Sequence, residues 1–169
     1  SSIPYLLKTF IHNYFSMSLI ELTKSAASLQ GKSQLEITKL SRLLSDLQKR
    51  ELPESVVTFI NGKVEEINST SLTGKPLEKF LATKVTEILK LLEKELKLVP
   101  QHHYRTQWMV LGMSAFGLPM GVAFGISIGN LGMLGLGLPI GMAIGIAMGS
   151  AMDEKAKKEG RQLNLTTEE

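Results

Sequence analysis

The feature that most constrains this chain is a run of 45 residues, 108–152, without Asp, Glu, Lys, Arg or His. All 35 charged residues lie in the other 124 positions, whereas the run holds 11 of the 15 glycines and 7 of the 8 methionines. A segment of this length and polarity must be dissolved in lipid or covered by an assembly. The sequence therefore argues strongly against an ordinary water-soluble globular protein.

The run contains two copies of one pattern, which lie 20 residues apart. Residues 117–129 and 137–149 are identical at 8 of 13 positions. One helical crossing of a bilayer takes about 20 residues, so the run is about twice as long as one crossing requires. We therefore expect a transmembrane hairpin of two helices, with its turn near residues 130–135, where glycine is densest.

Small residues recur on two faces of each expected helix. Glycine occupies every fourth position, at Gly117, Gly121, Gly125 and Gly129 and at Gly137, Gly141, Gly145 and Gly149. The opposite face carries Pro119, Ala123 and Ser127 in the first helix and Pro139, Ala143 and Ala147 in the second. Helices in lipid associate through such faces because their backbones can approach closely.

A hairpin that only holds itself together needs one narrow face per helix. Two narrow faces indicate a neighbour on each side, which predicts a homo-oligomer in which these residues pack helices or form a pore. The alternative is that the second face only reflects how common small residues are in membrane helices.

The repeated Gly-x-x-x-Gly spacing resembles the glycine-zipper class of membrane proteins, and this resemblance covers residues 112–149. The resemblance implies helices that line or surround an oligomeric pore. The helices are also similar to rotor-ring subunits of ATP synthases, but those need a carboxylate in the membrane, and none lies in residues 108–152.

Basic residues flank the run on both sides and predict its orientation. Lys94, Lys97 and Arg105 precede it, and Lys155, Lys157, Lys158 and Arg161 follow it. The positive-inside rule then places both termini in the cytoplasm, in a plasma membrane or a bacterial inner membrane. The run is too long for the apolar region of a signal peptide.

The chain before the run has the apolar spacing of helices, and the predicted fold class is all-α. We expect a cytoplasmic helical domain over residues 1–100, a juxtamembrane linker over 101–107, the hairpin over 108–152 and a charged cytoplasmic tail over 153–169. Four helices are predicted in the first domain, at 4–29, from a capping box at Ser33 and Glu36 to before Pro53, at 54–68 and at 76–98, which suggests a four-helix bundle. Asn61-Gly62 is also a β-hairpin signal, but its helical neighbours favour helix.

Two alternatives remain open in this domain. The leucine stripe of the fourth helix could associate between subunits instead of packing in a core. The aromatic first helix could lie on the membrane surface, although it carries few basic residues.

The sequence offers no catalytic or metal-binding pattern. Cysteine is absent, and the adjacent His102 and His103 lack further ligands, so we expect no metal, no cofactor and no enzyme. With Asn130, these histidines are candidates for polar groups at a pore mouth. The net charge of +3 is too small to indicate nucleic-acid binding.

These features predict a homo-oligomeric membrane channel or pore built from glycine-zipper hairpins and controlled by the cytoplasmic helical domain. The alternative is a non-conducting, membrane-anchored helical scaffold that recruits a cytoplasmic protein partner. The expected partners are membrane lipid and further copies of the chain.

Overall fold

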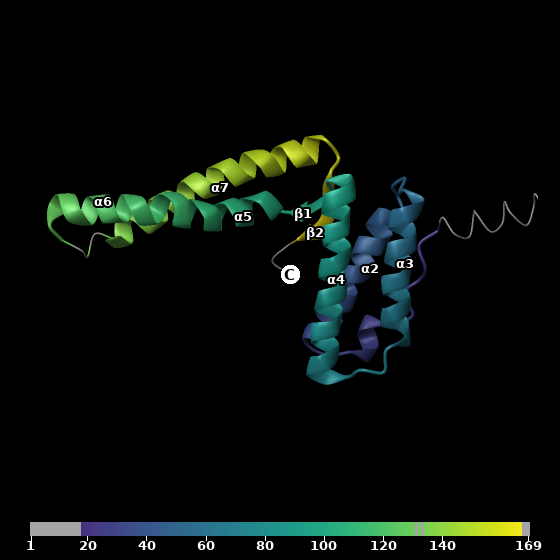
Figure 1. The fold of residues 1–169 in the computed structure, drawn as a ribbon. Coiled ribbons are helices and arrows are strands. Elements are labelled where there is room, and N and C mark those ends of the chain that lie inside the picture. The colour runs from purple at the N-terminus through teal and green to yellow at the C-terminus, as the bar shows by residue number, and fades with distance from the viewer. Residues whose placement is uncertain (1–17, 131, 133, 167–169) are drawn as a thin grey trace, which may run out of the picture. The chain divides into compact units, whose positions relative to one another are not determined.

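The computed structural model describes residues 18–130, 132 and 134–166, and it is mostly helical (Figure 1). It divides into two compact units. The first contains the described residues up to Leu98 and, from the other end of the chain, Leu163–Leu165. The second contains Val99–Gln162 and Thr166.

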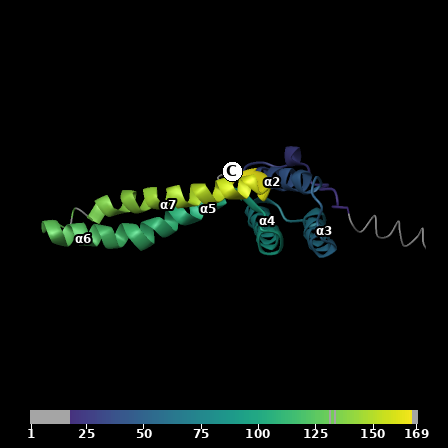
Figure 2. The same ribbon diagram turned by 90° about the horizontal axis from the view of Figure 1, so that it is seen from above.

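The first unit is a bundle of three helices, α2 (Lys32–Leu47), α3 (Glu54–Ser69) and α4 (Gly74–Leu96). Helix α4 packs against both α2 and α3, and the three lie side by side in two views (Figures 1 and 2). Each helix buries one apolar stripe, and the stripe of α4 consists of Leu77, Leu81, Val85, Ile88 and Leu92. The predicted helical spacing therefore forms the core of this unit.

The start of α2 differs from the prediction. Gly31, with a φ of 64°, occupies the N-cap position and offers no side-chain hydrogen bond. Ser33 lies inside the helix and is buried, so the predicted capping box with Glu36 is wrong. Glycine serves here because its missing side chain permits a positive φ.

The helix predicted at residues 4–29 is wrong over the part of it that the structure describes. Residues 1–17 lie outside the described part, and within 18–31 only a short 3-10 turn, η1 (Ala26–Ser28), is helical. Apolar residues at helical spacing (Leu19, Leu22, Ala26 and Leu29) do pack against the bundle core. The segment that carries them nevertheless has mostly no regular secondary structure.

Two asparagines of α3 form hydrogen bonds with the backbone of this irregular segment. Asn61 accepts a hydrogen bond from the Ile20 N–H at 2.8 Å and donates one to the Ser18 carbonyl at 3.0 Å. Seven residues on, Asn68 accepts from the Thr23 N–H at 3.0 Å and donates to the Glu21 carbonyl at 3.1 Å. The two side chains thus replace backbone partners that a helix would have supplied. The hairpin alternative at Asn61-Gly62 is wrong, because both residues lie within α3.

Two short parallel strands, β1 (Val99–Gln101) and β2 (Gln162–Thr166), were not predicted. Val99 is paired with Gln162, and Gln101 with Thr166. Along β2, Leu163 and Leu165 are buried and belong to the hydrophobic core that contains the α2, α3 and α4 stripes. The segment expected to be a charged tail therefore contains the end of a helix and a strand.

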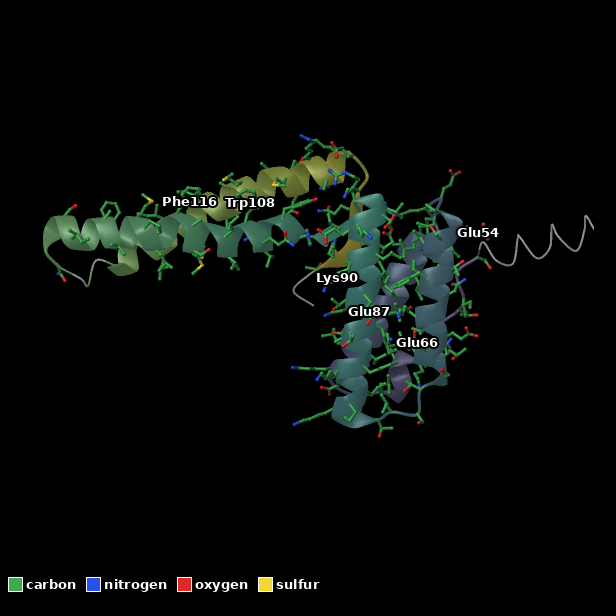
Figure 3. All side chains as sticks on the ribbon, viewed as in Figure 1. Glu54, Glu66, Glu87, Lys90, Trp108 and Phe116 are labelled. Carbon is green, nitrogen blue, oxygen red and sulfur yellow. The ribbon has the colours of Figure 1, made fainter. Side chains whose placement is uncertain are left out.

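Four charged side chains link α3 to α4, and two of them, Glu66 and Glu87, are labelled in Figure 3. Lys63 lies 2.9 Å from Glu87 and 3.3 Å from Glu66, and Lys84 also pairs with both glutamates. The ammonium of Lys84 lowers the pKa of Glu66, and the ammonium of Lys63 lowers the pKa of Glu87. The partner Glu87 raises the pKa of Lys63.

This network predicts acid sensitivity of the bundle. A lowered pKa in the folded state means that the glutamates stabilise the fold above their ordinary pKa of 4.5, and that this contribution is lost as the pH falls below it. Urea unfolding of the full-length protein between pH 3 and 6 should show this decline. In a Glu66→Gln/Glu87→Gln variant the decline should be shallower, and an unchanged profile would contradict the assignment.

Candidate functional site

The candidate site is the second unit's pair of antiparallel helical segments, here called the glycine-faced helix pair. One segment runs through α5 (His103–Gly112), a π-helical stretch η2 (Met113–Gly117) and α6 (Leu118–Ile128). The other is α7 (Leu134–Lys158), which packs along all three (Figures 1 and 2). By length and composition, both segments could cross a membrane, with 26 and 24 residues.

Glycines form most of the surface between the two segments. The buried glycines are Gly112, Gly117, Gly121 and Gly125 in the first segment and Gly137, Gly141, Gly145 and Gly149 in the second. A Cβ atom added to Gly141 would lie 2.5 Å from the Gly117 nitrogen, and one added to Gly149 would lie 2.5 Å from the Arg105 Cα atom. These separations are too short for real atoms, so the two backbones are in direct contact only because the side chains are missing.

Gly129 does not belong to this surface, although its spacing suggested that it would. It is exposed, has a φ of 68° and ends α6, with open space where a side chain would stand. Gly112 is instead the fourth buried glycine of the first segment. Asn130 follows in the turn and accepts a hydrogen bond from the Gly132 N–H at 2.9 Å.

The π-helical stretch explains this shift. Gly112 and Gly117 are five residues apart, which in an α-helix would turn them about 140° away from each other. Within η2 the Leu118 N–H instead reaches the Met113 carbonyl, five residues back, and the wider turn brings both glycines to one face. Pro119, which has no N–H to donate, follows in the first turn of α6 and favours such a break.

The residues predicted on the opposite small face all lie on the outside of the pair. Each is exposed within the described structure, whereas the glycines are used between the segments. They are Pro119, Ala123, Ser127, Pro139, Ala143 and Ala147. Pro139 lies inside α7, near its start.

One buried acid connects α7 to the start of α5 at the charged end of the pair. Asp153 of α7 is only 6% exposed and accepts hydrogen bonds from the backbone N–H groups of Tyr104 at 3.0 Å and Arg105 at 2.9 Å. These are N–H groups of the first turn of α5, whose own N-cap residue, His102, supplies no side-chain bond. Asp153 therefore caps α5 from the neighbouring helix. Sequence reasoning missed it, although an acid directly after the apolar run was a visible signal.

Replacing Asp153 by alanine should loosen this end of the pair. Loss of a capping side chain costs about 0.5–2 kcal/mol, because N–H groups of the first turn lose their acceptor. Amide hydrogen exchange at Tyr104 and Arg105 in the full-length protein should become faster. Glu154→Ala is the matched control, since its side chain is exposed and does not contact these amides; equal acceleration in both variants would refute the cap.

The predicted pore-mouth residues lie at opposite ends of the pair. His102 is the N-cap residue of α5 and has a φ of 59°. His103 is the first residue of α5, and its ring meets the Tyr104 ring edge-on, with the ring centroids 5.2 Å apart. Asn130 lies at the turn beyond α6. They therefore do not form one cluster within the chain. Among the described residues, no group of three His, Asp or Glu side chains is placed to hold a metal.

Comparison of the chain with family models, with curated proteins and with solved structures finds no match.

Proposed function

We propose that the chain is a membrane protein whose glycine-faced helix pair crosses the bilayer twice, associates with copies of itself and forms a channel or pore. The helical bundle would be cytoplasmic and would control it. The observation that carries this proposal is that the glycines are used within the pair, while the second set of small residues lies exposed on its outside.

The exposed apolar surface of the pair supports membrane insertion. Large side chains such as Val110, Leu118 and Ile126 are 61%, 55% and 71% exposed. In water a surface of this kind would promote aggregation, whereas lipid chains cover it without cost to the fold. Basic residues at the His103 and Lys158 ends, and none in the turn, favour a topology with both termini in the cytoplasm.

The outward small residues support self-association. A narrow strip of alanine, serine and proline allows a neighbouring helix to approach closely and gain van der Waals contacts that branched side chains would block. The strip runs along both segments, so each pair can contact a neighbour on either side. Repetition of one such contact by rotation closes a ring.

A second candidate function is a non-conducting scaffold that anchors the bundle to the membrane and recruits a cytoplasmic protein partner. A specific observation favours it. The Ser114 hydroxyl, one of few polar groups in the pair, donates to carbonyls of its own helix, Val110 and Leu111, each at 3.1 Å. It is therefore less available to line an aqueous path, and a pore would depend on apolar gating.

Mass measurement in mild detergent and ion flux in liposomes test the proposal together. The wild type should form a defined oligomer that conducts. Ala123→Leu/Ala143→Leu, which fills the outward small face, should shift the mass toward the monomer and abolish flux. Val122→Leu/Met142→Leu is the matched control, because these residues are also exposed but lie beside that face.

The outcomes separate the candidates. An oligomer without flux, or a monomeric wild type, contradicts the pore and supports the scaffold. An oligomer that persists in Ala123→Leu/Ala143→Leu would mean that another surface, such as the bundle, holds the copies together.

A further inference from the structure

A polar cleft of 330 Å³ lies in the second unit, at the charged end of the helix pair. Its lining includes His102 and Arg105 at the start of α5 and Ser150, Asp153, Glu154 and Lys157 from α7. The volume is at the lower end of the range of small-ligand pockets, about 300–1,000 Å³. None of the residues that line it belongs to the outward small face proposed above for self-association.

The two helices bring their basic side chains to this cleft from opposite sides. On α7, Ser150, Asp153, Glu154 and Lys157 follow the spacing of one helical face. The Arg105 backbone lies directly against Gly149, one residue before that face begins. Glycine packing thus sets the distance between the Arg105 and Lys157 sides of the cleft.

Both acids of the cleft have hydrogen-bond or ion-pair partners, whereas its two strong cations have no acid partner among the described residues. Both Asp153 oxygens accept backbone N–H groups, and Glu154 pairs with Lys158 at 3.6 Å. Within the described part of the chain, neither the Arg105 guanidinium nor the Lys157 ammonium has an acid within ion-pair distance. These two cations are therefore available to pair with an anion of outside origin.

We propose that this cleft binds the phosphate group of an anionic phospholipid. The inference rests on the proposed insertion of the pair into a membrane. Arg105 lies three residues before Trp108, and Lys157 five residues after Met152, so both flank the apolar run where side chains reach the headgroups. Arginine binds phosphate with a two-pronged hydrogen-bonding group, and basic pockets between membrane helices recognise lipid headgroups.

A lipid suits this cleft better than free phosphate does. The two helices that line the cleft also carry exposed apolar residues, including Val110 and Met148. Acyl chains attached to a bound phosphate could cover them, whereas an inorganic ion could not.

Trp108, the single tryptophan of the chain, provides the test. Full-length protein is reconstituted in phosphatidylcholine vesicles that contain phosphatidylglycerol or phosphatidylethanolamine, each labelled with dansyl on an acyl chain. Energy transfer from Trp108 is then measured. The wild type should associate roughly tenfold more strongly with phosphatidylglycerol, since each nearby basic side chain adds a severalfold preference for anionic lipid. Arg105→Gln/Lys157→Gln should reduce this preference to roughly twofold or less.

Lys94→Gln/Lys155→Gln removes the same charge from residues that do not line the cleft and should keep the preference. An equal loss in this control, or equal binding of both lipids by the wild type, overturns the inference. Competition by inorganic phosphate at constant ionic strength would show a free-phosphate site and also overturn it. Absence of transfer to either lipid would mean that the pair is not inserted, which is failure of the proposed function itself.

Discussion

Replacing Gly145 with alanine is expected to force the two helices of the pair apart and to destabilise the pair by about 1–3 kcal/mol. A Cβ atom at this position would lie 2.7 Å from the Trp108 carbonyl carbon and 2.9 Å from the Met109 Cα atom. Both are backbone atoms, so no side-chain rotation can relieve the overlap. Titration of the full-length protein in mixed micelles with SDS, followed through Trp108 emission, measures the loss.

Gly135→Ala is the matched control for this experiment. Gly135 belongs to the same helix, but nothing lies within 4 Å of the place where its Cβ atom would stand. Because alanine is a better helix former than glycine, this variant should be neutral or slightly more stable than the wild type. Equal destabilisation by both substitutions would mean that backbone contact does not hold the pair.

Replacing Leu163 with alanine is expected to destabilise the helical bundle by about 2–5 kcal/mol, although this residue is far from the bundle in sequence. Leu163 is 1% exposed and lies in the core that contains the stripes of α2, α3 and α4. Its truncation leaves a cavity among them. Hydrogen exchange of amides in these three helices, measured on the full-length protein, should become faster.

Asn164→Ser tests whether this effect depends on the core. Asn164 is the next residue of β2, and its side chain is exposed, so bundle exchange should stay near the wild-type rate. If Leu163→Ala also left the bundle amides unchanged, the end of the chain would not be part of that core.

The local pattern was sufficient to predict the helices whose apolar spacing is regular. Helix α3 (Glu54–Ser69) and helix α4 (Gly74–Leu96) lie within two residues of the predicted bounds. Their stripes are buried as helical spacing requires, because packing within a bundle follows from one repeating face. Two apolar helices long enough to cross a membrane were predicted on the same basis.

The segments that were predicted wrongly have structures that depend on partners distant in sequence. Leu19 and Leu22 have helical spacing, but Asn61 and Asn68 of α3 bind the backbone around them, and this backbone forms no helix. The short strand with Leu163 pairs with a segment about 60 residues earlier, which no local pattern reveals. Single-sequence periodicity contains no information on such pairings.

Most glycines of the surface between the helices could be predicted, but the point along the first segment where this surface begins and ends could not. Strict four-residue spacing selects Gly129, whereas the π-helical stretch before Pro119 moves the surface back to Gly112. The proline was a visible signal for a break, but its effect on the backbone could have been a kink as well as a π-bulge. The capping role of Asp153 required the antiparallel pairing to be known first.

The central claim is that the glycines of one chain pack its two apolar helices backbone to backbone in lipid. Solid-state NMR of protein labelled with ¹³C at glycine Cα, reconstituted in bilayers, tests it most directly. We expect cross-peaks from Gly117 to Gly137 and Gly141, and from Gly112 to Gly145, that persist when labelled chains are diluted into unlabelled ones. Cross-peaks that are absent, or that vanish on dilution because the glycines pair between copies, would contradict it.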